Sequence, residues 1–133
     1  MKTSIIIRAF NAENFIARAV QSALNQNFPE KEFEVVVVND GSSDRTREIL
    51  QFFEAEPRMR IFHQENRGAI FAANVGFNQA QGEYVVLVDD DDYLESNFLR
   101  ELTAILDRNP RFSFAYSDYY EEFEGEKRIN KPQ

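Results

Sequence analysis

The stretch Tyr84-Val85-Val86-Leu87-Val88-Asp89-Asp90-Asp91-Asp92 decides how this chain folds. A run that is apolar at successive positions predicts a strand buried on both faces of a parallel sheet. Unpaired carboxylates are too costly to bury, so the strand must deliver the four aspartates to an open edge of the sheet. Adjacent carboxylates repel each other, and Mg²⁺, Mn²⁺ and Ca²⁺ prefer oxygen ligands, so the pattern favours a divalent cation at this edge.

The composition restricts the classes of protein to which the chain can belong. Its 133 residues are enough for one domain with a hydrophobic core. The formal charge of −8 argues against nucleic acid as a partner. The absence of cysteine excludes disulfides and Cys-based zinc sites, and it fits a reducing compartment. With no signal-peptide pattern and no apolar run near ~18 residues, we expect a cytoplasmic location, at the inner face of the membrane if further sequence mediates peripheral association.

Strand and helix patterns alternate along the chain. Strands are expected at 4–7, 33–38, 59–63, 84–88 and 112–116, and helices at about 11–27, 44–55, 69–80 and 98–106. Asn11 is the expected N-cap of the first helix. The tail around Gly125 is expected to form a hairpin. This order predicts an α/β fold with a mostly parallel sheet flanked by helices, whose ligands lie at the carboxyl ends of the strands.

One stripe of the helix expected at 69–80 consists mostly of very small residues: Ala69, Ala72, Ala73, Gly76, Phe77 and Ala80. Such a stripe allows a close approach of backbones, and we interpret it as tight packing on the sheet.

Three strand ends meet at one rim in this topology, namely 8–11, 39–42 and 89–92. An aromatic ring, a turn carboxylate, hydroxyls and an acidic cluster in one crevice fit a nucleotide diphosphate. Phe10 would stack on a base, Asp40 would accept a hydrogen bond from the base or ribose, and the acidic cluster would hold Mg²⁺ or Mn²⁺ against the phosphates. Arg67 would add a second cation.

Simpler interpretations exist for the same residues. An acidic run is often a solvated loop, and Asn39-Asp40-Gly41 alone is typical of a plain turn; their positions after buried strands favour ligand contact. A calcium loop of the EF-hand type is excluded, because Leu94 and Arg100 stand where that loop needs Gly and Glu. His63, the single histidine, is expected to make a structural hydrogen bond.

Several motifs together resemble family 2 glycosyltransferases, which are inverting, nucleotide-sugar-dependent enzymes of GT-A fold. The motifs are Ser4-Ile5-Ile6-Ile7-Arg8-Ala9-Phe10-Asn11, Val35-Val36-Val37-Val38-Asn39-Asp40-Gly41-Ser42-Ser43-Asp44, Asn66-Arg67-Gly68, Ala80-Gln81-Gly82-Glu83-Tyr84 and Val88-Asp89-Asp90-Asp91-Asp92. They follow the family's order and spacing over nearly the whole chain.

The resemblance implies roles for individual residues. Phe10 and Asp40 would lie beside the base, and Arg67 would contact nucleotide or phosphate. Asp89-Asp90-Asp91 would be the Asp-X-Asp motif, with Asp90 facing the ribose; four consecutive aspartates leave its register open by one. The implied donor-binding residues are Arg8, Phe10, Asn11, Asp40, Gly41, Ser42, Arg67, Asp89 and Asp90. The implied ligands of Mg²⁺ or Mn²⁺ are Asp91, the main direct ligand, and Asp89.

The sequence also departs from the family pattern. Arg8 stands where many relatives carry Pro, and it would reach the phosphates or point to solvent. Ala73 stands where an Arg often precedes the residue matching Asn74. An inverting mechanism needs a general base, which in the family lies well beyond the Asp-X-Asp motif, in an acceptor-binding half. The chain ends about forty residues after Asp92, so no catalytic residue is assigned.

The resulting hypothesis divides the chain at residue 118. Residues 1–118 would be a nucleotide-sugar-binding GT-A domain, and 119–133 the start of an acceptor-side region, as a hairpin or frayed tail. The parent enzyme would transfer a sugar from a nucleotide-diphospho-sugar to a hydroxyl of a saccharide or lipid-linked acceptor, with inversion, while the isolated fragment would bind nucleotide without efficient transfer. The alternative is a non-catalytic nucleotide-binding or assembly module. An exposed hairpin or sheet edge would allow homo-oligomers.

Overall fold

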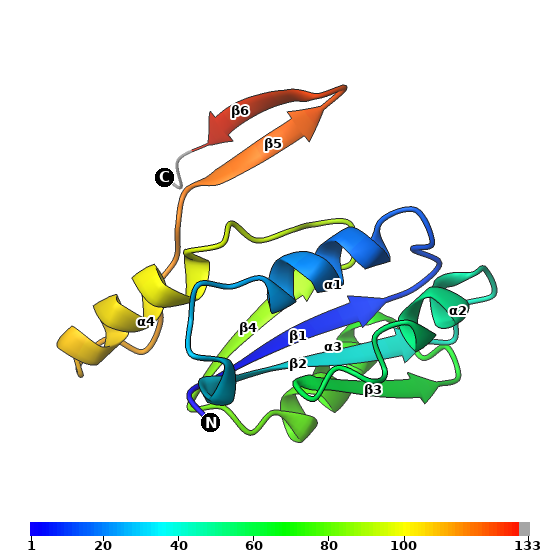
Figure 1. The fold of residues 1–133 in the computed structure, drawn as a ribbon, viewed down its shortest axis with the longest axis horizontal. Coiled ribbons are helices and arrows are strands. Elements are labelled where there is room, and N and C mark those ends of the chain that lie inside the picture. The colour runs from blue at the N-terminus through cyan, green and yellow to red at the C-terminus, as the bar shows by residue number, and fades with distance from the viewer. Residues whose placement is uncertain (131–133) are drawn as a thin grey trace. The chain divides into compact units, whose positions relative to one another are not determined.

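A four-stranded parallel sheet forms the centre of the first of two units in the computed structural model (Figure 1), which describes residues 1–130. This unit spans Met1–Leu99. Its elements are β1 (Thr3–Ala9), α1 (Ile16–Leu24), a short 3-10 helix (Glu30–Glu32), β2 (Phe33–Asp40), α2 (Thr46–Gln51), β3 (Met59–Gln64), α3 (Ala69–Gln79) and β4 (Tyr84–Asp89). Helix α4 (Phe98–Arg108) begins at the end of this unit. The alternation of strands and helices confirms the predicted α/β class.

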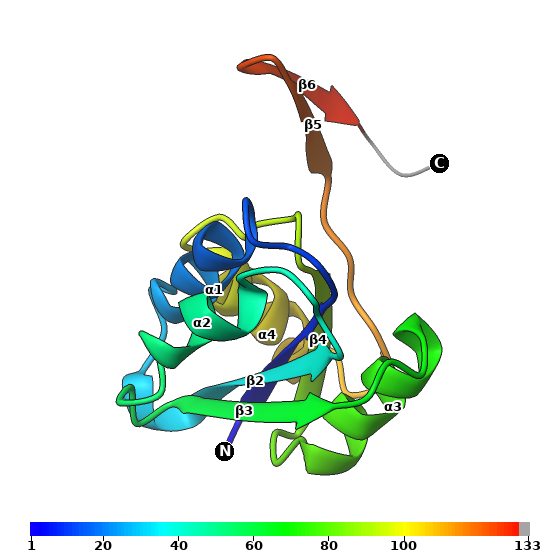
Figure 2. The same cartoon turned by 90° about the vertical axis from the view of Figure 1, so that its right-hand side faces the viewer.

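The strand order is β3-β2-β1-β4, and all three neighbouring pairs are parallel. Helices α1 and α2 cover one face of the sheet and α3 covers the other (Figure 2). The register places Arg8 beside Asp89 on adjacent strands. Because parallel strands end at the same edge, the carboxyl ends of β1, β2 and β4 lie together, as the sequence predicts.

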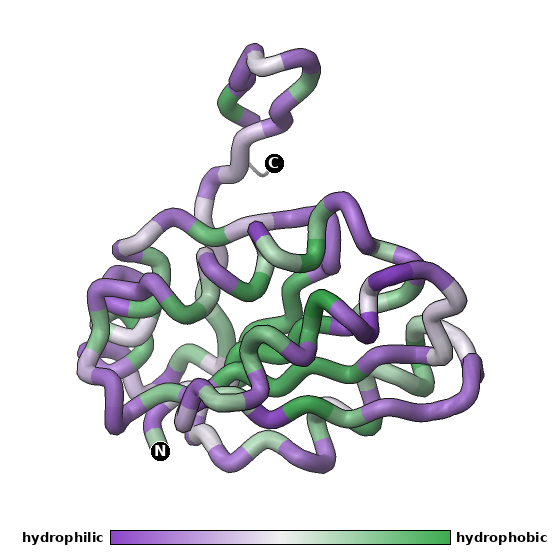
Figure 3. The backbone as a smooth tube through the Cα atoms, turned by 45° about the vertical axis from the view of Figure 1, so that its right-hand side comes forward, coloured by the Kyte–Doolittle hydropathy of each residue, from purple (hydrophilic) through white to green (hydrophobic). Residues whose placement is uncertain are grey.

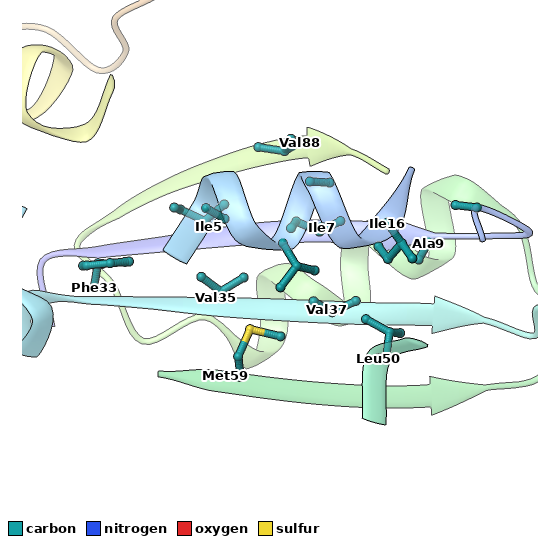
Figure 4. Packing of buried hydrophobic residues seen from close by; sticks show 14 of the residues in the cluster. Ile5, Ile7, Ala9, Ile16, Phe33, Val35, Val37, Leu50, Met59 and Val88 are labelled. Atoms are coloured by element: carbon teal, nitrogen blue, oxygen red, sulfur yellow. The ribbon is translucent and has the colours of Figure 1, made fainter. Parts of the chain in front are cut away.

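The hydrophobic core lies between the sheet and α1 (Figure 4). Ile5 and Ile7 of β1 and Val35 and Val37 of β2 are fully buried there, against Ile16 of α1. Hydrophobic residues concentrate in the interior of this unit and hydrophilic ones in its loops (Figure 3). The alternate residues of β1 and β2 are also buried, because α3 packs on the opposite face. Burial on both faces explains why these strands read as continuous apolar runs.

Strand β4 differs from the prediction that both of its faces are buried. Val88 is buried, whereas Val85 and Leu87 each remain 40% exposed. The register places Leu87 beside Ile6, which contacts α3, so the exposed pair lies on the α3 side of the sheet. The cause is that β4 is an edge strand of the described sheet and α3 packs mainly on β1 and β2.

Three local predictions are wrong. Asn11 is not the N-cap of α1, because its side chain accepts a hydrogen bond from the Ser43 N–H and the helix begins at Ile16. Helix α2 is shorter than predicted, since residues 52–55 form turns. Residues 112–116 form no strand.

The second unit, Arg100–Gln133, contains the predicted hairpin. Its antiparallel strands are β5 (Tyr119–Phe123) and β6 (Glu126–Asn130). The two turn residues, Glu124 and Gly125, have φ of 50° and 80°, as the favoured two-residue hairpin turn requires. The predicted domain boundary at residue 118 stays a prediction. The last three residues of the predicted acceptor-side region, 131–133, lie outside the described part of the chain.

The small-residue stripe of α3 permits close contact with the sheet. A methyl group at Gly76 would overlap the fully buried Ile6 side chain. Gly76→Ala is therefore expected to destabilise the protein by about 1 kcal/mol, since overpacking outweighs the helix propensity gained. Thermal unfolding checks this. The exposed Asn74→Ala on the same helix is the control for helix propensity without a packing change, and it should leave the melting temperature unchanged or slightly raised. A higher melting temperature for Gly76→Ala would contradict the packing argument.

Candidate functional site

A pocket of about 480 Å³ opens at the carboxyl ends of β1, β2 and β4. Its wall comes from the ends of these strands, the loop before α3 and the first turn of α3. The residues that line it are Arg8, Ala9, Phe10, Asp40, Asn66, Gly68, Ala69, Ala72, Asp89, Asp90 and Asp91. The topology therefore brings together six of the predicted site residues: Arg8, Phe10, Asp40, Asp89, Asp90 and Asp91.

Asn11 and Ser42 do not line the pocket but join the two loops beside it. The Asn11 N–H donates to Ser42 Oγ at 3.0 Å, and Ser42 Oγ donates to Asn39 Oδ1 at 2.6 Å. Asn39 is buried and its amide nitrogen lies 3.1 Å from Nδ1 of His63. His63 therefore has the structural contact that the sequence predicts. These hydrogen bonds fix the backbone of Asn11, the residue that follows Phe10.

Phe10 lines the pocket, and half of its surface is exposed. Its backbone N–H donates to Asp90 Oδ2 at 2.9 Å. An exposed ring on a fixed backbone is suited to stacking on a planar ligand. The contact with Asp90 also ties the loop after β1 to the acidic loop after β4.

The Asp40 carboxylate is almost fully buried and shapes the turn before α3. It accepts hydrogen bonds from Gln64 Nε2 at 2.7 Å, from the Arg67 N–H at 2.8 Å and from the Gly68 N–H at 2.9 Å. Gly41 has φ of 71° and lies so close to the Asn66 backbone that a side chain would overlap it. Asp40 and Gly41 thus hold the 65–68 turn, while contact of Asp40 with a base stays a prediction.

The two arginines of the predicted site occupy different places. The Arg67 guanidinium stacks 3.5 Å from the centre of the Phe71 ring, and Arg67 is not a lining residue. Arg8 lines the pocket and its Nε and Nη2 donate to Asp89 Oδ1 at 2.8 and 2.6 Å. Arg8 is therefore the arginine positioned to face an anion in this pocket, through a pairing that sequence reasoning did not anticipate.

The four aspartates have distinct surroundings. Asp89 pairs with Arg8 through one oxygen, and Asp90 accepts from Phe10. Asp91 lines the pocket, and within residues 1–130 no hydrogen bond to its carboxylate is formed. Asp92 does not line the pocket. Burial is the main cause that raises the pKa of both Asp90 and Asp92, and neighbouring carboxylates raise both further. Added positive charge would be favourable here.

The carboxylates at this edge of the pocket suit a cation that also binds phosphate oxygens. No group of three or more His, Cys, Asp or Glu side chains is gathered as a preformed metal cage in the described part of the chain. Mg²⁺ is commonly bound by one or two carboxylates and completed by phosphate and water. Asp91 and the free oxygen of Asp89 fit that pattern, so both stay as predicted ligands.

Sequence reasoning missed part of the pocket wall. Asn66 contributes through the turn that Asp40 holds, and Ala69 and Ala72 line the pocket from α3. The two alanines belong to the small-residue stripe, whose simplest interpretation is packing on the sheet. Their position directly after Gly68, beside a predicted ligand edge, was the signal that could have identified them.

Within residues 1–130, no helix is both long enough and apolar enough to cross a membrane.

A protein-family model matches almost the whole chain. Residues 4–132 match the family model described as "Glycosyl transferase family 2".

Curated relatives carry glycosyltransferase names. An uncharacterized glycosyltransferase of Rickettsia bellii is 33% identical over 89% of this chain. The poly(ribitol-phosphate) beta-N-acetylglucosaminyltransferase TarS of Staphylococcus aureus is 36% identical over 82%. The chain spans only 17% and 19% of the lengths of these two relatives.

Solved structures show the same fold. TarS 1-349 of S. aureus in complex with UDP aligns with a TM-score of 0.77 at 36% identity, over 83% of this chain and 33% of that one. The mannosyltransferase PcManGT of Pyrobaculum calidifontis, in complex with GDP-Man and Mn²⁺, aligns with a TM-score of 0.65 at 28% identity, over 69% and 28%.

Proposed function

Because the chain belongs to glycosyl transferase family 2, we propose that its pocket binds the nucleotide-diphospho-sugar donor of a metal-dependent glycosyltransferase. The observation that carries the proposal is the convergence of an exposed aromatic ring, an arginine and a free carboxylate in one pocket: Phe10, Arg8 and Asp91. These groups match the three chemical parts of such a donor, namely a planar base, a diphosphate and its cation.

Five of the lining residues have a physical role in this proposal. Phe10 stacks on the base, and its backbone is held by Asp90. Arg8, whose charge is partly balanced by Asp89, faces the diphosphate. Asp91, assisted by Asp89, holds Mg²⁺ or Mn²⁺. When bound, this cation offsets the charge that develops on the departing diphosphate.

For the chemistry beyond donor binding, the proposal extends what the family assignment supports. The sugar passes to a hydroxyl of a saccharide or lipid-linked acceptor with inversion, in the synthesis of a polysaccharide or glycoconjugate. Relatives support the donor class: a TarS structure contains UDP-GlcNAc, and the PcManGT structure contains GDP-Man and Mn²⁺. Uracil is the first base to test, because TarS is more similar to this chain in sequence than PcManGT is.

Calorimetric titration of the chain with UDP, GDP, dTDP and CDP, each with and without Mn²⁺, tests this function. We expect one nucleoside diphosphate, UDP first, to bind at least tenfold more tightly with Mn²⁺ than without it. Adenosine diphosphate with Mn²⁺ serves as a control for binding through phosphate alone. The absence of binding by all four nucleotides, or equal affinity for all five, would contradict a donor pocket that reads the base.

A further inference from the structure

The segment that follows the acidic run has little regular structure, yet its backbone is held along its length. Residues 92–95 belong to no helix or strand. Three polar side chains contact this segment from one side: Arg18 and Ser22 on α1, and Gln26 just after its end. Arg18 and Ser22 are four residues apart, which places them on the same face of α1. Gln26 follows on, since its Nε2 donates to the Ser22 backbone oxygen at 3.0 Å.

Arg18 contacts the start of this segment and the pocket aspartate that precedes it, Asp91. Its Nη2 donates to the backbone oxygen of Asp91 at 3.2 Å. Its guanidinium carbon lies 4.6 Å from the centre of the Tyr93 ring. One exposed arginine therefore contacts the residues on both sides of Asp92, so it restrains the backbone that carries the Asp91 carboxylate.

Ser22 and Gln26 hold the remainder of the segment. Ser22 Oγ accepts from the Leu94 N–H at 3.0 Å. Gln26 is 7% exposed; its Nε2 donates to the Glu95 backbone oxygen at 2.9 Å, and its Oε1 accepts from the Leu99 N–H at 3.0 Å. These side chains thus take the place of a neighbouring strand as partners of the segment's backbone.

We propose that Arg18, Ser22 and Gln26 form a clamp that positions the acidic loop, with Arg18 as the positioning residue for Asp91. The role of the clamp in binding rests on the proposed function. A cation bound between a carboxylate and a diphosphate tolerates little displacement of that carboxylate. Arg18 itself is exposed, and exposed polar contacts contribute little to global stability. Its loss is therefore expected to alter the loop far more than the fold.

Two variants and one control test the clamp. Arg18→Met removes the hydrogen bond and the charge but keeps an apolar stem, whereas Ser22→Ala removes an anchor without changing charge. Arg47→Met on α2 removes a comparable exposed charge that lies outside the pocket wall. The readouts are amide hydrogen exchange of residues 90–95, the melting temperature, and UDP affinity with and without Mn²⁺.

Both clamp variants should accelerate exchange in residues 90–95 and reduce the Mn²⁺-dependent affinity for UDP about tenfold. Metal-free UDP affinity should stay close to that of the unaltered protein in both variants. The melting temperature should stay close in Arg18→Met and fall slightly in Ser22→Ala, because the Leu94 N–H loses its partner. Arg47→Met should match the unaltered protein in all three readouts. Loss of affinity in Arg18→Met but not in Ser22→Ala would show that Arg18 acts through charge alone, and it would overturn the clamp. Unchanged exchange in both variants would overturn it too, whatever the affinities. If the unaltered protein binds none of the nucleotides, the proposed function fails while the exchange data still decide the clamp.

Discussion

Asp91→Asn is expected to abolish the Mn²⁺-dependent part of UDP binding and to leave the metal-free part unchanged. Asp91 lines the pocket, and no described group is hydrogen-bonded to its carboxylate, so this side chain is available to a cation. Asparagine has the same shape but lacks the charge that a hard cation prefers. Loss of the groups that hydrogen-bond to a metal ligand already lowers metal affinity about 10–100-fold, so removing the ligand itself should lower Mn²⁺ affinity at least about 100-fold. UDP affinity then falls by the whole of the gain that Mn²⁺ provides. Calorimetric titration with UDP, in the presence and absence of Mn²⁺, measures the Mn²⁺-dependent part of the affinity.

The neighbouring aspartate provides a matched control. Asp92→Asn changes the same net charge one residue away, at a position outside the pocket wall. We expect the UDP affinity of Asp92→Asn in the presence of Mn²⁺ to fall less than about threefold, because the effect of a neighbouring exposed charge is screened by salt. Equal losses in Asp91→Asn and Asp92→Asn would mean that the acidic run acts only through its total charge. A titration unchanged by Asp91→Asn would remove Asp91 from the ligand set.

Local sequence patterns predicted the sheet well because burial on both faces leaves a local signature. The runs Ile5–Ile7 and Val35–Val38 are continuous because α1 covers one face of the sheet and α3 the other. The position of the pocket followed from topology, since parallel strands release their next residues at one edge. Phe10, Asp40 and Asp91 therefore line one pocket although they are far apart in sequence.

Features that depend on contacts between distant parts of the chain could not be predicted from local sequence patterns. Arg8 meets Asp89 only because β1 and β4 are adjacent with these two residues side by side. The conformation of Asn11, with φ of 48°, follows from a contact with Ser43 on another loop. The exposed face of β4 depends on which strands α3 covers. None of these properties is encoded in the identity of neighbouring residues.

Asp40→Asn is expected to weaken both the fold and the donor pocket. The carboxylate accepts three hydrogen bonds, two on Oδ1 and one on Oδ2 from the Gly68 N–H. An asparagine that keeps its oxygen toward Gln64 and Arg67 must turn its NH₂ group toward the Gly68 N–H, which places donor against donor. The loss of charge also weakens the bonds that remain, so the free energy of unfolding should fall by about 2 kcal/mol. Denaturant unfolding measures this quantity.

The pocket should respond to Asp40→Asn through the turn that Asp40 holds, because Gly68 and the adjoining Asn66 both line it. We expect UDP affinity to fall at least tenfold with and without Mn²⁺, in contrast to Asp91→Asn, which affects only the metal-dependent part. Gln64→Ala is the graded control, since it removes one of the three donors and leaves the backbone contacts intact; a loss below about 1 kcal/mol and little change in affinity are expected. If Asp40→Asn lowered affinity only when Mn²⁺ is present, Asp40 would belong with the cation-binding residues rather than with the turn.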